Sequence, residues 1–188
     1  MLSPDSQALL LLCSHVAIAN NADLAPLTLR EWNALARRIQ ASQYLRPEGL
    51  LGQTASDLKM QLELSETEAE RVSRLLGRTE ELEMELKRLA AQGVRVFTRA
   101  DADYPQRYRQ RLKDSAPTVL FYAGEAALLG QPGIAVVGSR HLDQAGQECA
   151  AFVGNACGLS GLVLYSGGAK GVDTLSMNAA LEARGTAV

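Results

Sequence analysis

The stretch that decides the fold is "LVLYSGGAKGVD", which runs from Leu162 to Asp173. Four apolar or aromatic residues lead directly into a Ser-Gly-Gly-Ala-Lys-Gly sequence. A short apolar run followed by glycines is typical of a strand that is buried on both faces and ends in a tight turn. Glycines also let an anion approach the backbone N–H groups closely. The stretch therefore predicts a parallel sheet with an anion site at the end of one strand.

Three further apolar runs suggest other strands of the same sheet. They are "VRVFT" (94–98), "TVLFYAG" (118–124) and "GIAVVGS" (133–139). Segment 143–161, after the third run, carries apolar residues at helical spacing and a glycine-rich end. A strand, a helix and a second strand in this order form the unit of doubly wound α/β folds. A last helix, 174–185, leads into "TAV", which predicts the start of a fifth strand in a sheet that is truncated at its C-terminal end.

The first 92 residues carry helix signals instead. Helix starts are predicted at Ser3-Pro4, at capping boxes formed by Thr28 with Glu31 and Ser65 with Glu68, and before the segment 80–93. The first helix is expected to run through "SQALLLLCSHVAIA" (6–19). Trp32 and its neighbours at helical spacing are expected in the core. We therefore predict a helical domain over 1–92 and a Rossmann-like α/β domain over 93–188.

Composition limits the class of protein without identifying it. The net charge of −2 and the isoelectric point near 5.7 exclude a generally basic protein, so nucleic-acid binding would need a local patch. The longest apolar run, "ALLLLC" (8–13), is far shorter than the ~20 residues that span a bilayer. It also lacks the flanking features of a signal peptide. A cytoplasmic protein without a membrane segment is expected.

The cysteines and histidines predict neither a metal site nor a disulfide framework. The chain has three cysteines, Cys13, Cys149 and Cys157, without a CxxC spacing, and two histidines, His15 and His141. We expect reduced thiols, and no metal or other cofactor.

Two glycine-containing loops are the candidate binding site. Ligands of open parallel sheets bind beyond the carboxyl ends of the strands, where both "VVGSR" and "LYSGGAKGVD" are expected. Lys170 adds a flexible positive charge, and Arg140 adds a planar guanidinium that fits phosphate oxygens. The loop departs from a P-loop because Gly171 follows Lys170, and the chain has no GxGxxG fingerprint. The residues thus predict an anion at a helix N-terminus without saying which anion.

Several ordered motifs resemble the DNA-processing protein A (DprA or Smf) family. They are "YPQRYRQRLKDSAPTVLFYAGEAALL", "GIAVVGSR" and "SGGAKGVDTLSMNAALEARGTAV". The resemblance covers about the last 90 residues, and the first half looks like that family's helical N-terminal domain more loosely. The chain departs from the family pattern at Gly168, where the family has Leu, and at Ser176-Met177, where it has Ala-His. Family members continue beyond the equivalent of Val188, so a fragment or a reduced function is expected.

The resemblance implies a protein that binds single-stranded DNA and hands it to a RecA-type recombinase in natural transformation or recombination. Arg140 and Lys170 match the family's phosphate-contacting basic positions. The pocket around them would be formed by Gly138, Ser139, Ser166, Gly167, Gly168 and Gly171. The resemblance implies no catalytic residue and no cofactor, and it makes a homodimer possible.

The charged residues of the two loops also have simpler, structural interpretations. Lys170 fits a solvated loop lysine, and Arg140 fits a structural ion pair with Asp143 or Asp173. Asp173 also fits an N-cap of the last helix. Neither Ser139 nor Ser166 has a histidine placed by the sequence to act as a base, so nucleophilic catalysis is not expected.

Segment 94–113 has six basic residues against two acidic ones, with Tyr104 and Tyr108 between them. Such a mixture suits a DNA backbone with stacked bases. The simpler interpretation is a connecting segment in which Tyr104-Pro105 packs against the sheet. The alternative to a DNA-binding module is an enzyme or sensor of the wider Rossmann-like group that holds a small nucleotide.

Overall fold

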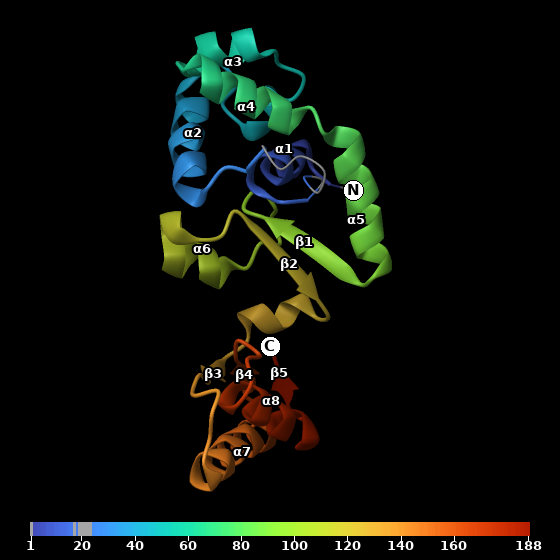
Figure 1. Ribbon diagram of the computed structural model, residues 1–188, viewed down its shortest axis with the longest axis vertical. Coiled ribbons are helices and arrows are strands. Elements are labelled where there is room, and N and C mark those ends of the chain that lie inside the picture. Colours follow the sequence, from blue (N-terminus) through green and yellow to red (C-terminus); the bar gives the residue numbers. More distant parts are fainter. Residues whose placement is uncertain (1, 17, 19–23) are drawn as a thin grey trace. The chain divides into compact units, whose positions relative to one another are not determined.

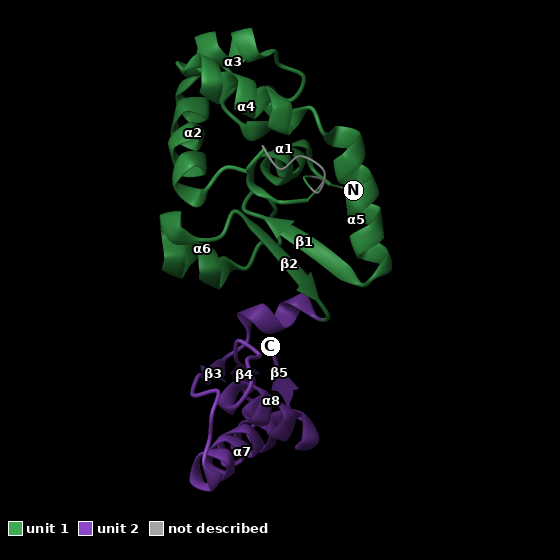
Figure 2. Ribbon diagram, viewed as in Figure 1, with its two compact units in different colours: residues 1–124 green, residues 125–188 purple. Residues whose placement is uncertain are grey.

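The computed structural model describes residues 2–16, 18 and 24–188. Its contacts divide the chain into two compact units, residues 1–124 (unit 1) and 125–188 (unit 2), as Figure 2 shows. Helices and strands occur together in both units, so the predicted α/β class is confirmed. None of the helices in the described ranges is long and apolar enough to cross a lipid bilayer.

Unit 1 consists of helices and a β-hairpin. Its elements are α1 (Pro4–Cys13), α2 (Leu29–Ala41), the 3₁₀ helix η1 (Pro47–Leu50), α3 (Ala55–Leu62), α4 (Glu66–Leu76), α5 (Thr79–Ala91), β1 (Val94–Thr98), α6 (Gln106–Leu112), the 3₁₀ turn η2 (Lys113–Ser115) and β2 (Val119–Ala123). The predicted caps are present. Ser3 accepts a hydrogen bond from the backbone of Ser6, and both predicted capping boxes are formed. A third box, Thr54 with Asp57, opens α3.

Helix α1 forms the centre of unit 1. Figure 1 shows it between α2, α4 and α5, with the hairpin on another side. Residues 8–12 are buried around the whole circumference of the helix, as a uniformly apolar helix requires. The helix ends at Cys13, so its predicted continuation into residues 14–16 is wrong. Ala17 and Ala19 of that prediction lie outside the described residues. Trp32, Leu35 and Ile39 belong to the same core, as predicted.

The strands β1 and β2 form a separate antiparallel hairpin, with Val94 opposite Ala123 and Thr98 opposite Val119. Their predicted place in the parallel sheet is therefore wrong. Val96 and Val119 pack against the helical core, and the Thr98 hydroxyl lies 2.9 Å from that of Ser6 on α1. These contacts make the hairpin part of unit 1. The compact units divide after Gly124, whereas the change in sequence periodicity placed the start of the second domain at residue 93.

Unit 2 contains the parallel sheet. Its elements are the 3₁₀ helix η3 (Ala126–Gly130), β3 (Gly133–Ala135), α7 (Gln144–Leu159), β4 (Val163–Tyr165), α8 (Val172–Glu182) and β5 (Thr186–Ala187). The strand order is β3-β4-β5, and Ile134, Leu164 and Ala187 are aligned in register. The predicted strand–helix–strand unit and the fifth strand are confirmed.

Helices α7 and α8 pack together through small residues. A β-carbon on Gly154 would overlap the backbone of Ser176, and one on Gly158 would lie 2.7 Å from the β-carbon of Ala183. Where the helix pair meets the sheet, Leu164 of β4 forms a small core with Cys157 of α7 and Ala180 of α8. This close packing brings the start of α8 beside the loop that follows β3.

Candidate nucleic-acid interface

The ladder between β3 and β4 continues beyond the strands into the two predicted loops. The N–H of Val136 donates to the carbonyl oxygen of Tyr165 over 2.8 Å, and the N–H of Ser166 donates to that of Val188 over 2.9 Å. The Ser166 hydroxyl donates to the carbonyl oxygen of Val136 over 2.9 Å. Ser166 thus joins the ends of three neighbouring chain segments.

The loop after β3 (138–140) touches the loop after β4 (166–171). The backbone N–H of Val172 donates to the carbonyl oxygen of Ser139 over 3.2 Å. A β-carbon on Gly171 would overlap the same oxygen and would lie 2.8 Å from Cα of Arg140. A β-carbon on Gly138 would meet the side chain of Val172. Glycine at both positions lets the two loops meet, which brings Arg140 next to the end of the lysine-containing loop.

Both loops present unused backbone donors. Within the described parts of the chain, no hydrogen bond is donated by the amides of Gly138, Ser139, Arg140, Gly167, Gly168, Lys170 and Gly171. These residues are exposed, except for the partly exposed Gly171, so water or an anion can reach them. We call these two loops the cradle. Exposed backbone N–H groups on glycine-rich loops of this kind can bind anions.

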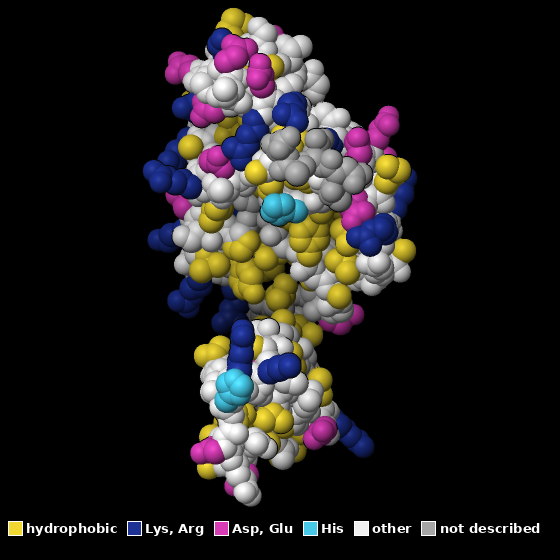
Figure 3. All heavy atoms as spheres, viewed as in Figure 1, with side chains coloured by type: hydrophobic (Ala, Val, Ile, Leu, Met, Phe, Trp, Pro, Cys, Tyr) yellow, Lys and Arg dark blue, Asp and Glu magenta, His cyan; other side chains and the backbone are white. Residues whose placement is uncertain are grey.

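The basic residues of the cradle are exposed. Arg140, Lys170 and Arg184 are the basic residues of unit 2, and Figure 3 shows two basic side chains beside a histidine on this unit. Among the residues that the structure places, neither Arg140 nor Lys170 forms an ion pair. Asp143, a suggested partner of Arg140, instead accepts a hydrogen bond from the Gly146 amide over 2.8 Å at the start of α7.

The buried side chain of Asp173 supports the loop after β4. Only 6 % of Asp173 is exposed, and its carboxylate accepts a hydrogen bond from the Ala169 amide over 3.4 Å. The prediction that it is the N-cap of α8 is wrong, because Gly171 occupies that position with φ = +90°. The amides of Val172 and Thr174 donate to loop carbonyls, so the start of α8 offers an anion fewer donors than a bare helix N-terminus.

The departures from the family pattern have local explanations. Gly168 has φ = +67°, a conformation that glycine adopts without strain, and its surroundings are open. Ser176 is fully buried, and its hydroxyl donates to the carbonyl oxygen of Asp173 over 3.0 Å. Met177 packs against the core of unit 2. The second departure therefore changes the packing under α8, away from the loop surface.

The serine side chains of the cradle take part in the hydrogen bonds of the loops themselves. The Ser139 hydroxyl donates to the carbonyl oxygen of His141 over 2.6 Å, which shapes the loop. In the ranges given above, no group of three His, Cys, Asp or Glu side chains is arranged to hold a metal ion. Sequence reasoning missed the organising roles of Val172 and Asp173. Their position in "GVD", directly after the glycine loop, was the available signal.

Comparisons with known proteins give two findings. The family described as DNA recombination-mediator protein A matches residues 95–188. The X-ray structure of DNA processing protein A (DprA) from Streptococcus pneumoniae matches with 26% identity and a TM-score of 0.46, over 86% of this chain and 56% of that chain. This chain thus spans little more than half the length of that relative. A comparison with curated proteins finds no match.

Proposed function

Because the chain belongs to the DNA recombination-mediator protein A family, we propose that it binds single-stranded DNA through the cradle of unit 2. The observation that carries the proposal is the meeting of two loops whose free amides lie beside Arg140 and Lys170. Phosphate groups suit this combination, since amides and guanidinium groups both donate to their oxygens. A backbone contact of this kind positions a strand without reading its sequence.

The cradle suits a strand better than a small nucleotide. Most of its residues are exposed, whereas pockets for small ligands enclose most of the ligand surface. An enzyme that cleaves a nucleotide would need a carboxylate at the reacting bond. Asp173 is buried and holds the Ala169 amide, so it is not placed for that task. The alternative of a small-nucleotide enzyme or sensor is retained as an outcome of the experiment below.

Family membership extends the proposal to the cellular role. The protein would protect single-stranded DNA and pass it to a RecA-type recombinase during natural transformation or recombination, acting in the cytoplasm as a binding protein without turnover. A homodimer is part of this proposal. Support for the recombinase and the dimer comes from the family alone.

The test is binding of labelled poly-dT, a matched duplex and free mononucleotides across a range of salt concentrations. We expect preference for the single strand and an affinity that falls steeply with salt. Arg140→Ala and Lys170→Ala should each reduce the magnitude of the salt slope by about 0.7, the value for one lost phosphate contact with a single strand. Arg184→Ala is the matched control, because it removes an exposed charge of the same unit outside the cradle.

The possible outcomes separate the two functions. Mononucleotide binding without preference for the strand would replace the proposal with the small-ligand alternative. Equal binding by the parent protein and by both cradle variants would reject the cradle as the site.

A further inference from the structure

Helix α6 carries the densest positive charge of the chain. Arg107, Arg109, Arg111 and Lys113 fall within seven consecutive residues that contain no acidic side chain. All four are exposed. A chain with a net charge of −2 therefore concentrates basic groups on α6 and on the first residue of the following turn η2. Figure 3 shows Lys and Arg side chains along the edge of unit 1 that α2 and α6 form.

A groove of about 480 Å³ adjoins this helix. Its lining includes Arg37, Arg46 and Arg99, together with Asp5 and Asp114. The guanidinium of Arg109 on α6 donates to the carbonyl oxygen of Arg99 over 2.9 Å. Asp114, which lies two residues after the end of α6, also lines the groove and forms an ion pair with Arg37 over 3.5 Å. Helix and groove thus form one continuous surface.

The two carboxylates that line the groove, those of Asp5 and Asp114, are already engaged. Asp5 accepts the Glu48 amide over 2.9 Å and forms an ion pair with Arg46 over 3.3 Å. Asp114 is paired with Arg37. Asp101, which follows Arg99 closely in the chain, accepts hydrogen bonds from Ser6 and from Thr98.

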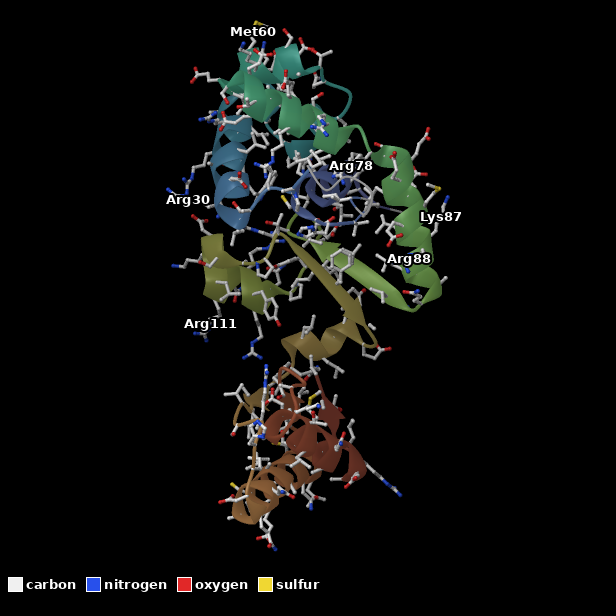
Figure 4. The ribbon with its side chains drawn as sticks, in the orientation of Figure 1. Arg30, Met60, Arg78, Lys87, Arg88 and Arg111 are labelled. Atoms are coloured by element: carbon white, nitrogen blue, oxygen red, sulfur yellow. The ribbon has the colours of Figure 1, made fainter. Side chains whose placement is uncertain are left out.

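The charges at the end of α6 have no such partners. In the parts of the chain that are placed, Arg111 and Lys113 form no ion pair or side-chain hydrogen bond. Figure 4 shows the Arg111 side chain extending outward from α6. The surface is therefore left with positive charge that an anionic partner can neutralise.

We infer that this surface, which we call the α6 face, is a second binding site for the phosphate backbone of single-stranded DNA. The α6 face consists of Arg37, Arg99, Arg107, Arg109, Arg111 and Lys113. The inference rests on the proposed function. The cradle and the α6 face are separate sites, one on each unit, and a long strand offers phosphates to both.

A nucleic acid fits the α6 face better than an acidic protein does. Protein interfaces have an apolar or aromatic centre that is buried on binding. Of the exposed large apolar side chains, Leu112 at the end of α6 is 43% exposed and Leu45 in the groove lining is 65% exposed. Tyr104 is only 1% exposed and donates its hydroxyl to the Pro117 carbonyl, so it belongs to the core. Guanidinium groups spread over a polar surface are instead typical of phosphate recognition.

The test compares two double charge reversals in the full chain. Arg111→Glu with Lys113→Glu changes the α6 face. Arg74→Glu with Lys87→Glu is the matched control, because it also reverses one exposed Arg and one exposed Lys without a partner among the placed residues. The control positions lie on α4 and α5, away from α6 in Figure 1. Binding of poly-dT of increasing length is measured across salt concentrations, with polyglutamate as a second probe. Circular dichroism verifies that both variants fold.

We expect the α6 variant to bind long poly-dT at least tenfold more weakly than the control, with the magnitude of the salt slope lower by about 1.4 for two lost contacts. Oligonucleotides that fill only the cradle should bind both variants alike. Equal binding of long poly-dT by both variants would overturn the inference, while loss of binding in the cradle variants would still support the proposed function. If the parent protein binds no poly-dT, the proposed function itself fails. Loss of polyglutamate binding with unchanged DNA binding would assign the α6 face to an acidic protein and overturn the inference.

Discussion

The backbone N–H of Val172 donates to the carbonyl oxygen of Ser139 over 3.2 Å, which fastens the start of α8 to the loop after β3. This bond joins two segments that are separated by a whole helix and strand in the sequence. It forms because Gly171 has no β-carbon to occupy the space beside Ser139. The shape of the cradle therefore depends on one glycine that contributes no side chain to binding.

Gly171→Ala should open the cradle. Gly171 has φ = +90°, and a β-carbon there would overlap the Ser139 carbonyl, so the loops must separate. We expect poly-dT binding to weaken at least tenfold and the free energy of unfolding to fall by about 1–3 kcal/mol. Fluorescence anisotropy and denaturant unfolding measure the two effects.

Gly168→Ala is the control for that substitution. Gly168 also has a positive φ, +67°, but no atom lies within 4 Å of the added carbon. It should show a loss of stability of about 1 kcal/mol without separation of the loops. Equal losses of binding in the two variants would mean that loop contact does not control the cradle.

Gly154→Ala should destabilise unit 2. The added β-carbon would overlap the backbone of Ser176 and lie 2.9 Å from the β-carbon of Ala179, so α7 and α8 must move apart. Overpacking of this kind costs about 1–3 kcal/mol. Thermal unfolding should show a lower midpoint than for Gly130→Ala, where the added carbon meets no atom within 4 Å. Similar midpoints would show that the helix pair adapts without cost.

The sequence was sufficient to predict local structure where one signal dominates. Capping boxes such as Thr28 with Glu31 determine where helices begin, and the apolar run before Ser166 determined a strand and its loop. The pairing of strands was not predictable in the same way. β1 and β2 have the same apolar character as β3 and β4, and only their contacts with α1 show that they belong to unit 1.

The candidate site was predictable in its residues and less so in its internal organisation. The glycines and basic residues of the cradle are visible as a motif. The role of Asp173 was misjudged because its distance from the glycine loop fits an N-cap as well as an internal support. The α6 face depends on three-dimensional neighbours, since Arg37 and Arg99 reach it from other parts of the chain.

Acid should destabilise unit 1 through Glu31. A hydrogen bond from Arg71, together with the backbone of Thr28, lowers the pKa of the Glu31 carboxyl to about 2. A lowered folded-state pKa stabilises the protein above pH 4.5, and this contribution is lost as the pH falls toward 2. The difference in melting temperature between the parent and Glu31→Gln should therefore shrink from pH 6 to pH 2.

Glu70→Gln is the control for the acid effect. Glu70 is exposed on α4, and its carboxylate accepts no hydrogen bond among the residues that the structure describes. Its removal should leave the melting temperature nearly unchanged at every pH. A gap between the parent and Glu31→Gln that stays constant with pH would contradict the role assigned to Arg71.

Thiol labelling should distinguish the three cysteines. Burial raises the pKa of the Cys13 thiol to about 12, so it remains protonated and unreactive at pH 8. Cys157 is 1% exposed, whereas Cys149 is exposed on α7. We expect one fast reaction with a chromogenic disulfide, which Cys149→Ser abolishes, and three reactive thiols in denaturant. Two fast thiols in the native protein would show that one of the other sites is open.

The join between the cradle loops has a consequence for protein engineering. The contact between Ser139 and Val172 uses main-chain atoms, so the scaffold of the cradle does not depend on the side chains of Arg140 and Lys170. Their chemistry can therefore be exchanged while the loop geometry is kept. Replacing both with neutral polar residues would give a template on which specificity for other anions can be selected, with the glycines held constant.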